Sequence, residues 1–201
     1  LSYQTAWLKA NHPVEFMAAV MNCDIHLTEK LNVYKQEIEN LGLELKSPCI
    51  NKSTAYFSVF DEKIYYALGA LKNIGIGAVE HIVDTRTSEG PFLNIFDFAQ
   101  RLDLRKVGKR PLEMLIRSGA FDCLNKNRKF LFTSIEKLVS FSTAVFEEKS
   151  SGQSNLFSTE TETVPKPILK AAEDWMFTEK LSQEYQSVGF YLSGHPIDEF
   201  L

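Results

Sequence analysis

The sequence predicts a mainly α-helical protein with one small β-hairpin. Three observations support this prediction. Apolar residues recur at helical spacing over most of the 201 residues. Two runs of aromatic and β-branched residues flank a short polar turn. One helical unit also occurs twice, at an offset of 33 residues, which indicates a duplicated supersecondary structure.

The first 45 residues are expected to be helical. One helix ends near Ala10, and Pro13 suits the first position of a second helix that continues to Met21. Thr28 is predicted to cap a third helix, and Gly42 to end it. The apolar positions of this third helix recur at helical spacing: Leu31, Tyr34, Ile38 and Leu41.

The predicted β-hairpin pairs residues 56–60 with residues 63–68 around Asp61-Glu62. The Asn-Gly or Asp-Gly residues that favour a type I′ turn are absent, so the turn type stays open. Residues 68–119 are expected to be helical again, with glycine-containing turns between the helices. Three phenylalanines in this region are expected to form core rather than a stacking platform for bases: Phe92, Phe96 and Phe98.

The C-terminal third of the chain is predicted to contain two helices separated by a linker. Asn125 or Asn127 can cap a long helix that runs to about Glu148. Residues 150–167 are rich in Ser, Thr, Glu and Pro, which predicts an exposed linker. A short helix is expected over residues 170–185, and His195-Pro196 is expected to be a turn rather than part of a catalytic site.

The repeat aligns residues 71–83 with residues 104–116 and places Gly75 on Gly108. Each unit consists of an apolar residue, a glycine turn and an amphipathic helix, so the sequence predicts a tandem helix-hairpin-helix. Gly75 and Gly77 are expected to allow positive φ and close approach of another backbone.

A helix start offers unpaired N–H groups and the positive end of the helix dipole, and both favour a DNA phosphate. In the second unit Arg110 replaces the glycine equivalent to Gly77, and Pro111 lacks an N–H, so side chains are expected to contribute more there. The predicted DNA-binding residues are Lys72, Asn73, Gly75, Gly77, Gly108, Lys109 and Arg110.

The charge distribution supports a nucleic-acid contact. The net charge of the chain is −4, but residues 101–129 carry nine basic and three acidic side chains and are therefore +6. A solvated helical face is the alternative interpretation of this basic run. Its basic residues are Arg101, Arg105, Lys106, Lys109, Arg110, Arg117, Lys126, Arg128 and Lys129.

Three cysteines and four histidines form no spacing typical of a zinc site. An odd number of cysteines fits reduced thiols in the cytoplasm, and no membrane helix or signal peptide is evident. The linker contains Gln153-Ser154-Asn155-Leu156-Phe157, a peptide that suits docking in an apolar cleft. The alternative is that Leu156-Phe157 folds back on the protein's own surface.

Several strings of this sequence resemble the C-family replicative polymerases, the alpha subunits of bacterial DNA polymerase III. The resemblance covers essentially the whole chain. It rests on residues 2–10, 12–19, 74–77, 104–107, 118–122 and 189–196.

This resemblance implies a domain organisation. Residues 1–66 would be the C-terminal part of the fingers region, and residues 67–128 the tandem helix-hairpin-helix that grips duplex DNA. The long helix of residues 129–149 would lead to the linker of residues 150–167, in which Gln153–Phe157 binds the sliding clamp, the beta subunit. Residues 168–201 would contain a helix and the start of the following region.

The resemblance also implies that the parent chain is a DNA-directed DNA polymerase that uses Mg²⁺ and works with other replicase subunits. The family's catalytic aspartates belong to the palm, and no stretch here matches that motif, so this segment is expected to be inactive and to need no cofactor. Two other interpretations stay open at this point. One is an accessory domain of a repair nuclease, against which the absence of DxD, ExK or HxH arrangements argues. The other is a structural protein-interaction module.

Overall fold

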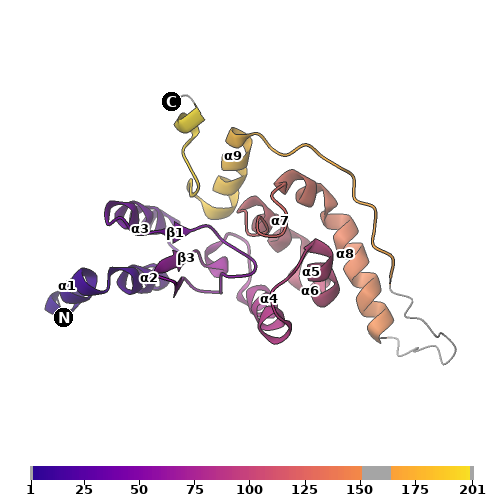
Figure 1. Cartoon of the computed structure of the whole chain (residues 1–201), viewed down its shortest axis with the longest axis horizontal. Coiled ribbons are helices and arrows are strands. Elements are labelled where there is room, and N and C mark those ends of the chain that lie inside the picture. The colour runs from indigo at the N-terminus through magenta and orange to yellow at the C-terminus, as the bar shows by residue number, and fades with distance from the viewer. Residues whose placement is uncertain (1, 151–163, 200–201) are drawn as a thin grey trace.

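The structure is a computed structural model that describes residues 2–150 and 164–199 (Figure 1). It is mainly helical with one small sheet, as the sequence predicts. Three helices and the sheet form the N-terminal part at the left of Figure 1. The helices are α1 (Ser2–Asn11), α2 (Pro13–Cys23) and α3 (Thr28–Asn40), and the strands are β1 (Leu45–Lys46), β2 (Ser58–Phe60) and β3 (Lys63–Tyr65).

Local signals in the sequence set the ends of these helices, with one exception. Pro13 opens α2 as predicted. Gly42 adopts a φ of 68° after α3, and the Leu43 N–H donates to the Ile38 carbonyl at 3.0 Å, which closes the helix. The prediction that Thr28 caps α3 is wrong, because Leu27 holds the cap position. Thr28 is the first helical residue, and its methyl group lies against Gly189.

The β-hairpin forms where the sequence predicts it, but the strands are shorter and the sheet gains a strand. Asp61 and Glu62 have φ values of 52° and 54°, the positive values that a type I′ turn requires; aspartate tolerates this conformation, but glutamate seldom adopts it. The additional strand, β1, pairs in parallel with β3, which gives the order β1-β3-β2. The side chain of Asn22 on α2 fixes β2 by donating to the Phe57 carbonyl at 2.8 Å and accepting its N–H at 2.7 Å.

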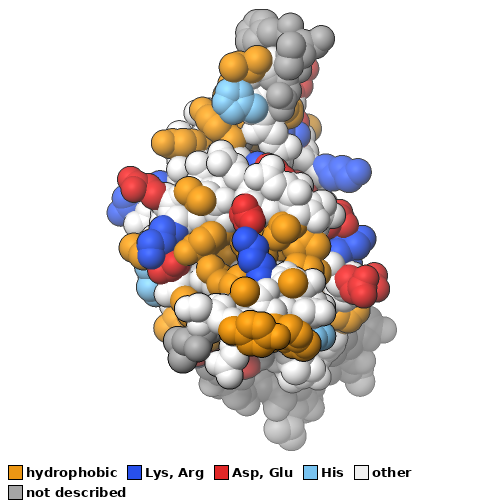
Figure 2. Space-filling view, turned by 90° about the vertical axis from the view of Figure 1, so that its left-hand side faces the viewer, with side chains coloured by type: hydrophobic (Ala, Val, Ile, Leu, Met, Phe, Trp, Pro, Cys, Tyr) orange, Lys and Arg blue, Asp and Glu red, His pale blue; other side chains and the backbone are white. Residues whose placement is uncertain are grey.

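The helix α1 lies at the periphery of the molecule and packs on α2. None of its described side chains is buried, and Tyr3, Trp7 and Leu8 are exposed. Figure 2 shows the face at this end of the molecule, where hydrophobic side chains gather and Lys and Arg side chains are interspersed with Asp and Glu. This end therefore presents no continuous basic surface.

The central part of the chain forms one core of short helices against the long α8. The Phe98 ring meets the rings of Phe92 and Phe121 at 4.9 Å in both cases, edge to face, and all three side chains are buried. Phe96 packs against Phe141 of α8, so the phenylalanines are core as predicted. The elements are the short 3₁₀-helix η1 (Leu68–Ala70), α4 (Ile76–Glu89), α5 (Ile95–Arg101), α6 (Leu104–Val107), α7 (Lys109–Arg117) and α8 (Arg128–Ser150).

Asn127 is the residue that caps α8, one of the two candidates from the sequence. Its carbonyl accepts the Leu131 N–H at 3.2 Å, and its side chain accepts the Phe130 N–H at 2.8 Å. Asn125 in turn accepts the Asn127 N–H at 2.9 Å, which positions the capping residue.

The predicted helix over residues 170–185 begins later than expected. Residues 164–176 are extended, and α9 covers Phe177–Val188, followed by the 3₁₀-helix η2 (Pro196–Glu199). Side chains of the α8 region hold this extended segment, because Asn127 donates to the Ala172 carbonyl at 2.7 Å and Lys137 to the Ile168 carbonyl at 2.6 Å. The Trp175 side chain is buried against Phe132. No helix within residues 2–150 and 164–199 is long and apolar enough to cross a membrane.

Candidate nucleic-acid interface

The repeated units place two glycines at equivalent points of the structure. Gly75 is the N-cap of α4, and Gly108 is the N-cap of α7. Buried positions also correspond between the units, since Val79 and Ile82 of α4 align with Leu112 and Leu115 of α7. The helix α4 packs against α6, the short helix that precedes the second glycine. The two units are thus neighbours with a common core.

The N-terminus of α4 is open to an external ligand. Lys72, Asn73, Gly75 and Gly77 are exposed, and no side chain caps the helix. The N–H groups of Ile76 and Gly77 have no acceptor among the described residues. A Cβ atom added at Gly75 or Gly77 would meet nothing within 4 Å. These glycines therefore leave the surface over the free N–H groups uncovered, where an anion is favoured.

The conformational role predicted for the first pair of glycines is wrong. Gly75 has a φ of −77°, and Gly77 is an ordinary helical residue. The left-handed residue of this hairpin is Asn73, with a φ of 59°. Asparagine tolerates this conformation better than most residues, so the turn does not depend on glycine.

The second hairpin does require its glycine. Gly108 has a φ of 90° and a ψ of 149°, a region open almost only to glycine. The N–H groups of Lys109 and Arg110 have no acceptor among the described residues, and both side chains are exposed. Pro111 follows and supplies no N–H. The second helix start therefore offers two N–H groups and two cationic side chains.

The nine basic residues of the predicted patch divide into those whose side chains are held by other groups of the protein and those whose side chains are not. Arg101 is fixed inside the protein by five hydrogen bonds to residues 85–97, and Arg128 is buried and pairs with Asp122 and Glu184. Arg105 pairs with acidic groups, and Arg117 binds Gln186 and lies over a phenylalanine ring. Besides Arg117, four of the nine basic side chains form no ion pair with any described residue: Lys106, Arg110, Lys126 and Lys129.

Lys109 is intermediate between the basic residues held by the protein and those without an ion pair. Its ammonium lies 2.7 Å from a Glu136 carboxylate oxygen, and this hydrogen bond raises the Lys109 pKa and lowers the Glu136 pKa. Both side chains are largely exposed, and a surface pair of this kind is weak. A phosphate can therefore replace Glu136 as the partner of Lys109 at little cost. The positive charge that remains available to a ligand is therefore smaller than the net +6 counted from the sequence of residues 101–129.

The first hairpin is tied to the C-terminal segment. The Lys72 N–H donates to the Ser187 carbonyl of α9 at 2.8 Å, and the Lys72 ammonium lies 5.9 Å from the centre of the Tyr185 ring. Beyond α9, the buried carboxylate of Glu184 accepts the N–H groups of Leu192 and Ser193 at 2.6 and 2.8 Å. Glu184 thereby fixes the course of residues 189–196 next to the hairpin, a role that no local pattern in the sequence indicates.

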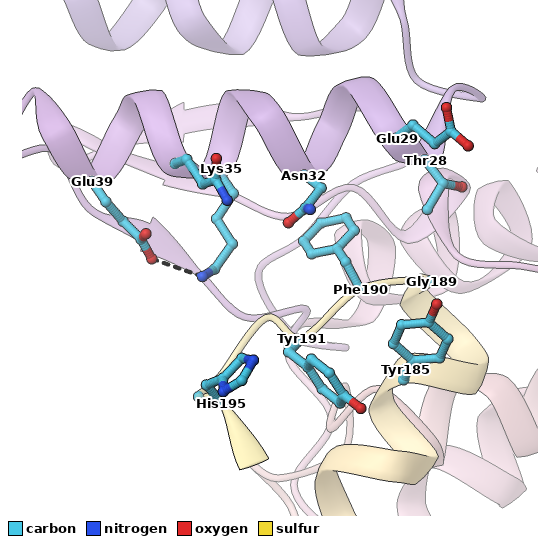
Figure 3. Close-up of a pocket in the computed structure, with 12 residues that line it drawn as sticks. Thr28, Glu29, Asn32, Lys35, Glu39, Tyr185, Gly189, Phe190, Tyr191 and His195 are labelled. Carbon is cyan, nitrogen blue, oxygen red and sulfur yellow. Dashed lines mark ion pairs between the residues drawn. The ribbon is translucent and has the colours of Figure 1, made fainter. Parts of the chain in front are cut away.

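A cleft of about 620 Å³ lies between α3 and this segment (Figure 3). Tyr185, Tyr191 and His195 form one wall, and their rings stand 5.2 and 5.7 Å apart. The opposite wall is polar and includes Asn32 and the Lys35–Glu39 ion pair of 2.8 Å. His195 accepts the Ile197 N–H at 3.3 Å, which is consistent with the turn predicted for His195-Pro196.

The predicted clamp-binding peptide, residues 153–157, lies outside the described residues. The described chain ends at Ser150 of α8 and resumes at Val164. Among the described residues, no group of three or more His, Cys, Asp or Glu side chains could hold a metal ion.

Comparisons with known proteins agree with the duplicated hairpins. A model of the helix-hairpin-helix motif matches residues 42–131. The chain is 41% identical over 201 residues to the DNA polymerase III subunit alpha of Caulobacter vibrioides, covering 100% of the chain and 18% of that relative. It is 38% identical over 219 residues to the same subunit of Pseudomonas fluorescens, covering 100% and 19%. It is 39% identical over 201 residues to that of Neisseria meningitidis serogroup A, covering 100% and 17%. The chain thus spans less than a fifth of the length of these relatives.

Proposed function

Because this chain belongs to the DNA polymerase III alpha subunit family, we propose that it is the segment that holds duplex DNA and tethers the polymerase to its sliding clamp. In this proposal residues 1–66 end the fingers region, and residues 67–128 form the DNA-binding helix-hairpin-helix pair. The long helix of residues 129–149 then leads to the clamp-binding linker of residues 150–167, and residues 168–201 begin the region that follows.

The observation that carries the DNA-binding proposal is the pair of glycine N-caps, Gly75 and Gly108, at helix starts whose first N–H groups have no acceptor among residues 2–150 and 164–199. Each start would receive one phosphate of the duplex through backbone N–H groups. Lys72 and Asn73 would flank the first phosphate, and Lys109 and Arg110 the second. Such contacts read no base, as a polymerase that copies any sequence requires.

Salt dependence and substitution test this grip. Binding of the chain to a short duplex is measured by fluorescence anisotropy at several salt concentrations. Lys109→Ala and Arg110→Ala should each weaken binding to all sequences alike and reduce the slope of log K against log salt by about one. Lys9→Ala on α1 removes the same charge far from both helix starts and serves as the matched control. Binding that is independent of salt, or an equal loss in Lys9→Ala, would contradict the proposed site.

The clamp-binding proposal rests on the Gln153-Ser154-Asn155-Leu156-Phe157 peptide. Leu156 and Phe157 would enter an apolar cleft of the clamp, and the Gln153 amide would fix the register of the peptide. A contact of this size is weak alone. Because the clamp encircles the same DNA, tethering raises the effective concentration of the polymerase and supports processive synthesis.

Titration of the chain with purified clamp tests this contact. Phe157→Ala should lose most of the affinity, since it removes the largest anchor of the peptide. Phe60→Ala is the matched control, because it removes the same ring from an exposed position on β2, outside the peptide. Equal clamp affinity of Phe157→Ala and the unmodified chain would rule out the tether and leave the DNA-binding proposal standing.

We further propose that the parent chain is a DNA-directed DNA polymerase acting in the cytoplasm with other replicase subunits. Its catalytic Mg²⁺ would be held by aspartates elsewhere in the parent, as the family resemblance implies. In this proposal the segment contributes DNA binding and the clamp tether to the parent.

A further inference from the structure

Two cysteines that lie 74 residues apart in the sequence meet in the structure. Cys49 is in the loop after β1, and Cys123 is in the turn after α7. The Ile50 N–H donates to the Ala120 carbonyl at 2.7 Å, and the Cys123 sulfur lies 3.9 Å from the same oxygen. This contact brings the two cysteines close enough for each thiol to shift the pKa of the other. Cys123 is exposed and Cys49 is partly buried.

The loop around Cys49 is a tight turn with cationic side chains beside it. The Lys52 and Ser53 N–H groups donate to the Cys49 carbonyl at 3.1 and 2.8 Å, which forms a tight turn. Arg86 of α4 donates to the Ile50 carbonyl at 2.7 Å and so brings a guanidinium to the same loop. A low-pKa cysteine is commonly found beside cationic side chains.

The thiols consequently differ in protonation. The hydrogen bond from Cys123, followed by those from the backbone N–H groups of Asn51 and Lys52, lowers the pKa of Cys49 to about 6 against the opposing effect of burial. The hydrogen bond to Cys49 and burial raise the pKa of Cys123 above its usual range. Cys49 is therefore the more acidic of the two thiols.

We propose that Cys49 is a site of oxidation by hydrogen peroxide and that Cys123 converts the product into an intramolecular disulfide. The Cys49 thiolate attacks one peroxide oxygen, the O–O bond breaks, and hydroxide leaves, so that Cys49 becomes a sulfenic acid. The Cys123 sulfur then attacks the Cys49 sulfur. The S–O bond breaks, the S–S bond forms, and the hydroxyl group leaves as water with the thiol proton. The two sulfurs together lose two electrons to the peroxide.

The disulfide would join two points near the ends of residues 42–131, the stretch matched by the helix-hairpin-helix model. It would also fix the loop whose Ile50 carbonyl receives Arg86 from α4, the helix that starts at Gly75. The inference goes beyond DNA and clamp binding and does not depend on either of them. The experiment that tests it measures the oxidation state of the two sulfur atoms.

The test treats the full chain with a small excess of hydrogen peroxide, alkylates the remaining thiols and maps the peptides by mass spectrometry. The Cys49–Cys123 cross-linked peptide should form in the unmodified chain and in Cys23→Ser, the matched control that removes the third cysteine. In Cys123→Ser a sulfenic acid should accumulate on Cys49 and react with a 1,3-dicarbonyl probe. Failure of the disulfide to form, or equal oxidation of Cys23 and Cys49, overturns the proposal.

Alkylation kinetics give a second measurement that needs no substituted protein. At pH 6 Cys49 of the folded chain should react with iodoacetamide on the order of tenfold faster than Cys49 of the urea-unfolded chain, because a larger fraction is thiolate. Equal rates in the two states would also overturn the assignment of Cys49 as the reactive thiolate.

Discussion

The substitution Gly77→Ala separates folding from DNA binding at the start of α4. Gly77 is the second residue of this helix and has ordinary helical geometry. A methyl group there would meet nothing within 4 Å, so no part of the protein opposes it. On the outer side, the same methyl group would stand beside the free N–H groups that the proposed phosphate approaches.

The two effects have opposite signs. Alanine favours a helix over glycine by up to about 1 kcal/mol, so Gly77→Ala should raise the free energy of unfolding by a few tenths to 1 kcal/mol. A charge-assisted hydrogen bond contributes about 1.5–3 kcal/mol. If the methyl group displaces one phosphate from the helix start, the Kd for duplex DNA should rise about tenfold or more.

Urea unfolding followed by circular dichroism measures the first effect, and fluorescence anisotropy with a short duplex measures the second. Gly69→Ala is the reciprocal control, because its Cβ would lie 2.5 Å from the Ala55 carbonyl oxygen. That substitution should lower stability and leave the DNA affinity of the folded protein unchanged. An unchanged Kd for Gly77→Ala, or a loss of stability, would refute the reasoning about this helix start.

Three further predictions concern the framework of the site. Gly108→Ala should lower the free energy of unfolding by about 1–3 kcal/mol in urea, because its φ of 90° and ψ of 149° strain any other residue. Glu184→Gln should cost about 2 kcal/mol by the same assay, since charge-assisted hydrogen bonds to Leu192 and Ser193 become neutral ones; equal stability would contradict this. The hydrogen bond from Arg105 lowers the pKa of Asp103 in the folded protein. The ionised Asp103 therefore stabilises the fold at pH values above its unfolded pKa of about 3.9, and this stabilisation is lost as the pH falls through the folded pKa. The stability deficit of Asp103→Asn should therefore be constant near pH 7 and shrink below about pH 4.

The parts of the fold that the sequence predicts correctly are those with local causes. Pro13, Gly42 and Asn127 mark helix ends because each acts on backbone groups within a few residues. Each unit of the 33-residue repeat is likewise recognisable from a short stretch of sequence, and the repeat places Gly75 and Gly108 at equivalent N-caps. The clamp-binding peptide of residues 153–157 stays a prediction, since it lies outside the described residues.

The errors concern groups whose partners are distant in the chain. Residues 170–176 have helical composition but are extended, because the Asn127 side chain donates to the Ala172 carbonyl and the Lys129 N–H donates to the Asp174 carboxylate. The parallel strand β1 depends on β3, 17 residues or more along the chain. The basic run of residues 101–129 is predicted as one patch, but Arg101 and Arg128 bind carbonyl and carboxylate groups of the protein itself.

The sequence by itself determines that two amphipathic helices each begin at a glycine and that cationic residues stand beside the second one. Periodicity and capping act over a few residues, so they are visible in the order of the amino acids. Only the tertiary structure decides which N–H groups have no acceptor among the described residues and which arginines pair with carboxylates inside the protein. It also decides that Cys49 lies close to Cys123. These outcomes follow from the packing of segments far apart in the chain, and the pairing of such segments leaves no periodic signal in either one.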